Sequence, residues 1–236
     1  MALHANGGLI VGGRNIAFKR LPPEDPSATV VLLDNTAAPD IVGFNDLTTD
    51  PAGRIYVGSL GFVAAGGAGA DNGRTGFLHL IDLDGSSRIV SDGVRLTNGL
   101  GFSPNGKLLY HSDSRSGIIR VYDVAGDGTL SPPRSFAPIS TGIPDGLAVS
   151  EDGRVWVALA YGGAVAVFAP DGREVERIAV PVPMVTSLCF AGNDLRDLYI
   201  VTGPKDSPPE LKGCVYRTRV EVPGLGRPPA RVAIKG

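Results

Sequence analysis

Apolar and polar positions alternate in short runs along this chain, and turns that contain glycine separate the runs. Stretches such as "RIYVGS" from Arg54 and "RVWVAL" from Arg154 are rich in β-branched and aromatic residues, which is typical of strands. The chain contains 33 Gly and 19 Pro, and no convincing amphipathic helical run lies between them. The pattern therefore predicts an all-β protein made of many short strands.

One pattern recurs along the chain. "FNDLTTDPAGRIYVGS" begins at Phe44, "TNGLGFSPNGKLLYHSD" at Thr97 and "PDGLAVSEDGRVWVAL" at Pro144. A degenerate copy, "TSLCFAGNDLRDLYIVT", begins at Thr186, and "LHANGGLIVGG" near the N-terminus matches only the second half of the unit. Each complete copy reads as a polar residue, an apolar strand, a turn with glycine and a second strand, which is the signature of a β-hairpin.

Aligning the copies superimposes Asn45, Asn98, Asp145 and Thr186, at intervals of 53, 47 and 41 residues. Further strand-like runs such as "GIIRVYDV" and "GAVAVFAPDG" follow the copies, so each repeat holds about four strands. A strand-only repeat of ~40–50 residues is typical of a propeller blade. We therefore expect residues 1–236 to form a single β-propeller domain of about five blades.

The aligned polar residues are candidates for a binding site. Equivalent positions in the blades of a propeller meet at one mouth of the central channel, so Asn45, Asn98 and Asp145 are predicted to converge there. The alternative is that each residue only caps a turn through local backbone hydrogen bonds. Amide and carboxylate oxygens without cysteine or clustered histidine suit a hard cation such as Ca²⁺ or Mg²⁺.

Other residues receive simpler interpretations. The three histidines, His4, His79 and His111, share no metal-binding spacing, and His111 is expected to be packed in the fold. Trp156 and Tyr199 occupy the second strand of their copies and are expected in the core. We also expect the two cysteines, Cys189 and Cys214, to be buried free thiols of a reduced, cytoplasmic protein.

Composition excludes several classes of partner. The net charge is −2 and no long basic cluster occurs, which argues against nucleic-acid binding. No run approaches the ~20 apolar residues of a membrane span, and the first residues do not resemble a secretory signal. A small molecule is the expected partner.

At the residues of the repeat, the sequence resembles the family of senescence marker protein, gluconolactonase and luciferin-regenerating enzyme, and more distantly diisopropyl fluorophosphatase. The matching motifs are the four copies that begin at Phe44, Thr97, Pro144 and Thr186, together with the closing "GCVYRTRVEVPGLGRPP". The resemblance implies a six-bladed lactonase-type propeller with one divalent cation in its channel.

The resemblance also implies roles for particular residues. Asn98 and Asp145 match metal ligands of the family, and Asp145 also matches the residue usually assigned as general base. Asn45 matches a channel asparagine that lies near the metal and contacts substrate or bound water, so we include it among the candidate ligands. The expected cation is Ca²⁺, with Mg²⁺, Zn²⁺ or Mn²⁺ as alternatives.

Two departures from the family pattern affect this interpretation. Family members carry a metal-binding glutamate in their first blade. We expect this chain to lack both that blade and its glutamate. The earliest glutamate of the chain, Glu24, does not match the family's metal-binding glutamate. At ~45 residues per blade, 236 residues make about five blades. Gly43 stands where sugar-lactone members often have an arginine, which predicts a roomier or more apolar mouth.

The leading hypothesis is a metal-dependent hydrolase that opens lactones or related esters, with the cation polarising the carbonyl and Asp145 as base. The first alternative is a non-catalytic or weakly active ligand-binding propeller, because the family's glutamate is missing. The second is a hydrolase of phosphotriesters or aryl esters on the same fold. A propeller that lacks a blade is also expected to close by re-spacing its blades or to form a homo-oligomer through unpaired strand edges.

Overall fold

The structure of this protein is a computed structural model that describes residues 1–21, 29–38, 40–62, 73–211 and 213–235. Glu24 lies outside the described residues. The described residues form strands and one short 3-10 helix, η1 (Pro209–Leu211), so the all-β prediction is confirmed. None of the described helical structure is long and apolar enough to cross a membrane.

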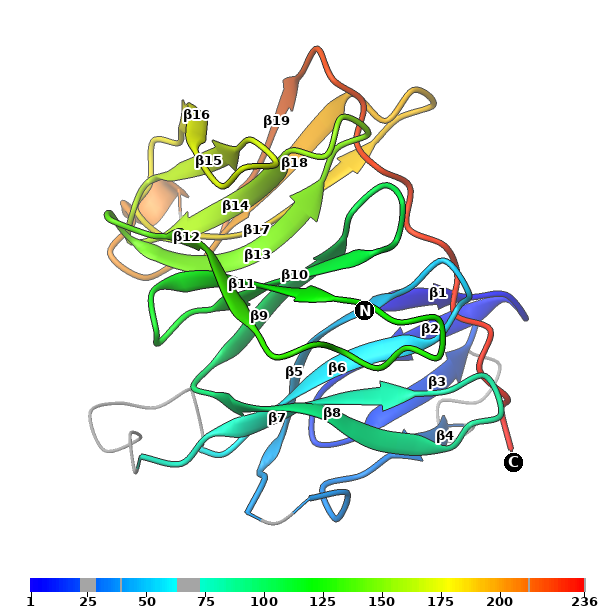
Figure 1. Ribbon diagram of the computed structural model, residues 1–236. Coiled ribbons are helices and arrows are strands. Elements are labelled where there is room, and N and C mark those ends of the chain that lie inside the picture. The colour runs from blue at the N-terminus through cyan, green and yellow to red at the C-terminus, as the bar shows by residue number, and fades with distance from the viewer. Residues whose placement is uncertain (22–28, 39, 63–72, 212, 236) are drawn as a thin grey trace. The chain divides into compact units, whose positions relative to one another are not determined.

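The strands of the described residues form five sheets, and each sheet is built from strands that follow one another in the sequence (Figure 1). The chain divides into two compact units, the first made of residues 1–97, 125–130 and 227–236 and the second of residues 98–124 and 131–226. That the whole chain acts as a single domain stays a prediction.

The first unit contains two four-stranded sheets. One consists of β1 (Ala2–His4), β2 (Gly8–Val11), β3 (Ile16–Arg20) and β4 (Thr29–Leu33). The other consists of β5 (Gly43–Thr49), β6 (Ile55–Leu60), β7 (Gly76–Ile81) and β8 (Ser87–Val94). One continuous cluster of buried side chains from both sheets, including Ile10, Phe44 and Ile55, packs them together.

The second unit contains three sheets. The first has β9 (Thr97–Phe102), β10 (Leu108–Asp113), β11 (Ile118–Asp123) and β12 (Arg134–Pro138). The next has β13 (Ile143–Val149), β14 (Val155–Ala160), β15 (Ala164–Phe168) and β16 (Glu174–Ala179). The last has only three strands, β17 (Val185–Ala191), β18 (Asp197–Thr202) and β19 (Val215–Arg219).

The hairpins of the repeat turn at the glycines that the sequence pattern singled out. Gly53, Gly106 and Gly153 have φ angles of 95°, 69° and 83°, in the left-handed region that favours glycine. The backbone N–H of each glycine donates to the carbonyl three residues earlier, at 2.9, 2.8 and 2.9 Å. The shared turn chemistry therefore explains why each copy reverses direction at the same point.

Strand β14 shows how the sheets of the second unit share a core. All six of its residues are buried. Because side chains alternate between the two faces of a strand, Val155, Val157 and Leu159 join the cluster shared with the β9–β12 sheet. Trp156 and Ala158 point the other way, into the cluster shared with the β17–β19 sheet. An apolar run without polar alternation is thus a strand covered on both faces.

Trp156 is buried in the core, as predicted, but Tyr199 is only half-buried and lies under the Arg217 guanidinium. Both cysteines are free, as predicted, but the expectation that they are buried is wrong. In β17, Leu188 faces the core, so its neighbour Cys189 faces solvent, and Cys214 is partly exposed.

The second unit also contains a very close approach of two backbones. A Cβ atom added to Gly99 of β9 would lie 2.2 Å from the backbone nitrogen of Leu147 and 2.8 Å from the carbonyl oxygen of Asp145, both in β13. A Cβ added to Gly146 would lie 2.9 Å from the Cα of Ser187 in β17. Only glycine allows neighbouring first strands to lie this close.

We predict that Gly99→Ala lowers the free energy of unfolding by about 3 kcal/mol, because the new methyl group has to displace the backbone of β13. Gly126→Ala is the matched control, since a Cβ at Gly126 meets no heavy atom within 4 Å. That control is expected to change stability by less than about 0.5 kcal/mol. Urea unfolding of the wild type and both variants measures the difference, and equal midpoints for the two variants would contradict the packing argument.

Candidate functional site

Two of the predicted site residues, Asn45 and Asp145, lie at irregularities of the first strands of their sheets. In β5, Phe44 pairs with Ser59 and the next paired residue is Leu47, so Asn45 lies in a β-bulge. In β13, Pro144 pairs with Leu159 and the next paired residue is Leu147, so Asp145 also lies in a bulge.

Thr186, the aligned residue of the degenerate copy, occupies the corresponding irregularity of β17. A bulge turns a side chain out of the regular alternation of its strand, and bulges are frequent next to active sites. Asn45, Asp145 and Thr186 therefore lie inside strands and not in the hairpin turns.

Asn98 and Asp145 belong to the second unit, and a buried serine connects their strands. The side-chain amide nitrogen of Asn98 donates to Ser114 Oγ at 2.7 Å. Ser114 Oγ in turn donates a short hydrogen bond to the carbonyl oxygen of Pro144, the residue before Asp145. The chain Asn98–Ser114–Pro144 thus ties the two candidate ligands to one another.

Asn45 belongs to the first unit and is held in a related way. Its side-chain amide nitrogen donates to the carbonyl oxygen of Thr97 at 2.7 Å. Thr97 itself is packed against Gly58, where an added Cβ would lie 2.0 Å from the threonine side chain. Asn45 is exposed, whereas Asn98 and Asp145 are half-buried. The convergence of Asn45 with the other two residues stays a prediction.

The donor atoms of Asn98 and Asp145 fit a hard cation. The oxygen and nitrogen of an asparagine amide are bonded to the same carbon and point in different directions. When the nitrogen donates a hydrogen bond, the oxygen therefore points elsewhere, and oxygen is the atom that Ca²⁺ and Mg²⁺ take as ligand. Asp145 adds a carboxylate. Among the described residues, no group of three or more His, Cys, Asp or Glu side chains could hold a metal ion. Asn98 and Asp145 together offer one neutral amide oxygen and one carboxylate, and oxygen ligands suit Ca²⁺ better than Zn²⁺.

The histidines are core residues. His79 Nε2 lies 3.0 Å from Ser59 Oγ, its ring packs edge-on against Phe44, and only 1% of it is exposed. Burial lowers the pKa of His79 to about 4. Burial also lowers the pKa of His111 to about 3, although Asp113 opposes the shift. His111 is therefore packed, as predicted, and both histidines are neutral at pH 7.

The Gly43 position leaves no room for a side chain. A Cβ there would lie 2.9 Å from the carbonyl oxygen of Gly13, which accepts a hydrogen bond from the backbone of Phe44 at 2.7 Å. The arginine common in sugar-lactone members therefore could not be placed here without moving the backbone of Gly13. The expectation of a roomier or more apolar mouth stays a prediction.

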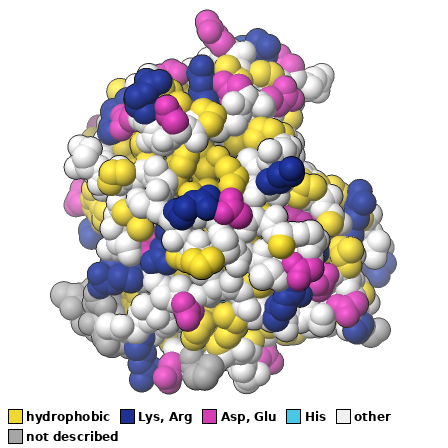
Figure 2. Space-filling view, viewed as in Figure 1, with side chains coloured by type: hydrophobic (Ala, Val, Ile, Leu, Met, Phe, Trp, Pro, Cys, Tyr) yellow, Lys and Arg dark blue, Asp and Glu magenta, His cyan; other side chains and the backbone are white. Residues whose placement is uncertain are grey.

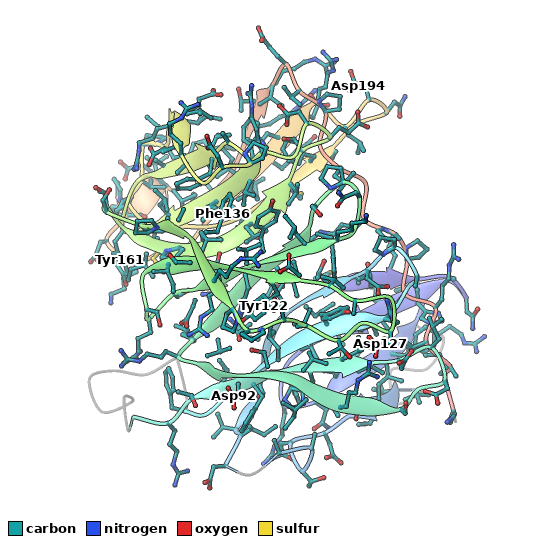
Figure 3. The ribbon with its side chains drawn as sticks, in the orientation of Figure 1. Asp92, Tyr122, Asp127, Phe136, Tyr161 and Asp194 are labelled. Carbon is teal, nitrogen blue, oxygen red and sulfur yellow. The ribbon has the colours of Figure 1, made fainter. Side chains whose placement is uncertain are left out.

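Two side chains that sequence reasoning did not select lie at the same end of the second unit as Asp145. Ala160 pairs with Ile143, at the start of the strand that carries Asp145, and Tyr161 follows it with a φ of 59° (Figure 3). The Lys205 ammonium lies 5.3 Å from the centroid of the Tyr161 ring. Neither residue was detectable from the repeat, because the copies diverge after the second strand.

Charged side chains of both signs are interspersed on the face drawn in Figure 2, and no histidine is visible there. This face shows no extended basic area of the kind that binds nucleic acid.

A family model described as the SMP-30/Gluconolactonase/LRE-like region matches residues 1–203. The chain belongs to this family. It is 34% identical over 206 residues to 6-deoxy-6-sulfogluconolactonase from Pseudomonas putida, with 84% of this chain and 68% of that protein covered. It is 32% identical over 205 residues to pentonolactonase XacC from Haloferax volcanii, with 81% and 67% covered.

Solved structures show the same fold. A luciferin-regenerating enzyme superimposes with a TM-score of 0.84 at 24% identity, covering 98% of this chain and 80% of that one. A regucalcin from Agrobacterium tumefaciens, described as a calcium-binding protein, gives a TM-score of 0.82 at 19% identity, covering 98% and 78%. The predicted lactonase-type β-propeller fold is confirmed, with five sheets as its blades.

The comparisons also support the expected enzyme class, a lactonase-type hydrolase, at the level of the family. The roles of the individual residues Asn45, Asn98 and Asp145 stay predictions. The cytoplasmic location and the homo-oligomer stay predictions as well.

The buried His79 predicts a pH dependence of stability. Its pKa in the folded protein, about 4, lies below the ordinary value of 6.5, so the unfolded chain binds a proton between these pH values that the folded protein does not. Stability is therefore lost as pH falls from 6.5 toward 4, by about 2 kcal/mol at pH 5 from this group.

Urea unfolding at pH 7.5 and pH 5 measures this loss in the wild type and in His79→Gln. The variant is expected to lose about 2 kcal/mol less than the wild type between the two conditions, because glutamine does not titrate. An equal loss in both proteins would show that His79 is not the group responsible.

Proposed function

We propose that this protein is a metal-dependent lactonase that opens lactones or related esters with a divalent cation, Ca²⁺ in the first place, held by Asn98 and Asp145. The observation that carries the proposal is the Asn98–Ser114–Pro144 hydrogen-bond chain, which holds the Asn98 amide against the backbone that leads into Asp145. Membership of a family with named lactonases supports the reaction class. Mg²⁺, Zn²⁺ and Mn²⁺ are the alternatives for the cation.

Asn98, Asp145 and Asn45 each have a defined role in this proposal. Asn98 offers its amide oxygen as a neutral ligand. Asp145 supplies the negative charge, and it accepts a proton of the attacking water while the water oxygen bonds to the acyl carbon. The ring C–O bond then breaks, and Asp145 returns the proton to the leaving ring oxygen, which gives a hydroxy acid. Asn45 contacts the substrate or a bound water. A bound cation would polarise the lactone carbonyl and stabilise the charge that develops on its oxygen.

The small number of anionic ligands sets the expected affinity for the cation. Calcium sites are tuned by the number of charged ligands and by their rigidity. One carboxylate and neutral amides predict a weaker site than one with several carboxylates. We therefore expect turnover to rise with added Ca²⁺ over a range well above trace concentration.

The substrate is proposed to be a small lactone with limited ring polarity. Because Gly43 packs against Gly13, no side chain there can bind the hydroxyl groups of a sugar ring. We expect a higher kcat/KM for lactones with few hydroxyl groups than for sugar lactones. A panel of both classes, with an aryl ester and a phosphotriester, separates this proposal from the other hydrolase classes.

Replacing Asp145 is predicted to have the largest effect on activity. Asp145→Asn keeps the shape of the side chain and removes its charge, so kcat is expected to fall by a factor of about 10²–10⁴ while the fold is retained. Asn98→Ala is expected to reduce activity less, since it removes a neutral ligand. Asp171→Asn is the control, because it removes a carboxylate from an exposed turn of the same sheet.

A chelator is expected to silence the wild type, and added Ca²⁺ to restore it. Lactone hydrolysis that survives both the chelator and Asp145→Asn would mean that the chemistry occurs elsewhere. Absence of any turnover, with intact metal binding, would favour a non-catalytic ligand-binding propeller.

A further inference from the structure

Ser114 directly follows β10 and is almost completely buried, with 4% of its surface exposed. It belongs to the copy that carries Asn98, and the corresponding positions in the neighbouring copies are Gly61 and Tyr161. No other complete copy aligned with it thus has a hydroxyl group of this kind at this position. The serine is a feature of the Asn98 repeat and not of the repeat in general.

The direction of the two hydrogen bonds determines how the Asn98 amide is oriented. A serine hydroxyl has one proton to donate, and Ser114 donates it to the carbonyl oxygen of Pro144. Ser114 Oγ is then left only with lone pairs toward Asn98. It can accept from the amide nitrogen, which lies 2.7 Å away, but it cannot donate to the amide oxygen. The nitrogen of Asn98 is therefore held against Ser114 and the oxygen is directed away from it.

The same hydroxyl also fixes the peptide that leads into Asp145. The carbonyl of Pro144 belongs to the peptide group whose nitrogen is that of Asp145, so its hydrogen bond sets the plane of that peptide. This matters because Asp145 lies in a bulge, where regular pairing with β14 does not fix the backbone. One buried hydroxyl thus orients the amide of one candidate ligand and the backbone of the other.

Asn45 shows the same use of an amide nitrogen without a serine. Its nitrogen donates directly to the carbonyl oxygen of Thr97, and Thr97 precedes the next aligned residue in the sequence, as Pro144 precedes Asp145. In both places an asparagine is anchored to the carbonyl before the next member of the set. Ser114 serves as the intermediate where the amide does not bond to the carbonyl itself.

We propose that Ser114 is a positioning residue of the metal site, which holds the Asn98 oxygen and the Asp145 backbone in the arrangement that binds the cation. The inference rests on the proposed function, since it requires Asn98 and Asp145 to be the ligands. Groups that orient metal ligands typically contribute 10–100-fold to affinity or activity. We therefore expect Ser114→Ala to weaken Ca²⁺ binding by a factor of about ten or more.

The chain provides a matched control two residues earlier. Ser112 lies in β10 and is fully buried, and its Oγ has no hydrogen-bond partner among the described residues. Ser112→Ala therefore removes the same group from a neighbouring buried position without removing a hydrogen bond. Ser114→Cys is a second test variant, because it keeps the volume of the side chain and forms weaker hydrogen bonds.

The experiment is isothermal titration of Ca²⁺ into the metal-stripped protein, with the melting temperature of each variant recorded. Ser114→Ala and Ser114→Cys are expected to bind more weakly than the wild type, Ser114→Thr to bind within about threefold of it, and Ser112→Ala to bind as the wild type does. In an Asn98→Ala background, Ser114→Ala is expected to have a smaller further effect than in the wild type, because only the hydrogen bond to the Pro144 carbonyl is then left for the serine to lose.

Lactone hydrolysis gives a second readout. A positioning role predicts that excess Ca²⁺ restores most of the kcat of Ser114→Ala, because the defect is in binding the cation. Damage to folding alone would not be reversed in this way. If Ser114→Ala fails to fold, the comparison of Ser114→Cys with Ser112→Ala decides the question.

The outcomes separate this inference from the proposed function. If the wild type binds Ca²⁺ and Asn98→Ala weakens it, but both Ser114→Ala and Ser114→Cys bind as the wild type does, the positioning role is wrong and the proposed ligands stand. If the wild type binds no divalent cation, or Asp145→Asn binds as well as the wild type, the proposed function and the role of Ser114 are both overturned.

Discussion

The candidate site depends on the contact between the backbones of β9 and β13 at Gly99. A side chain at this position would overlap the Leu147 nitrogen and the Asp145 carbonyl, so the two strands lie as close as two backbones can. This closeness is what allows one serine hydroxyl to reach both the Asn98 amide and the Pro144 carbonyl. Gly99 follows Asn98, and Gly146 follows Asp145. In both cases the missing side chain makes room for the first strand of the next sheet, β13 beside Gly99 and β17 beside Gly146.

Two features lie at this contact, the bulge in β13 and the buried hydroxyl of Ser114. The bulge in β13 takes Asp145 out of the regular ladder and changes the direction of its side chain. The buried hydroxyl of Ser114 then holds the Pro144 carbonyl, because hydrogen bonds away from water are costly to break. The Asn98 amide and the peptide before Asp145 are thereby held by the same hydroxyl group. In the proposed function, ligands on a rigid scaffold would lose less entropy when a cation binds, which would partly compensate for the low charge of the proposed site.

The other polar groups of the interior have a structural role. His79 is paired with Ser59, and Asp113 forms a buried ion pair with Arg120 at 2.6 Å. His79, Ser59 and Asp113 are nearly or fully inaccessible, whereas Asn98 and Asp145 are half-buried and can meet a small molecule. A general base or a metal ligand needs such partial access, which is why the histidines of this chain are poor candidates for catalysis.

The sequence by itself determined the strands, the hairpin turns and the succession of sheets, because all of these depend on local patterns. The alternation of side chains, the glycine turns at Gly53, Gly106 and Gly153, and the spacing of the copies are legible without a structure. It also singled out Asn45, Asn98 and Asp145, since the repeat aligns them. The tertiary structure alone decided the hydrogen bonds of Ser114, the exposure of Cys189 and the lack of space at Gly43. Each of these depends on which backbone lies beside which, and that information resides in contacts between strands far apart in the sequence.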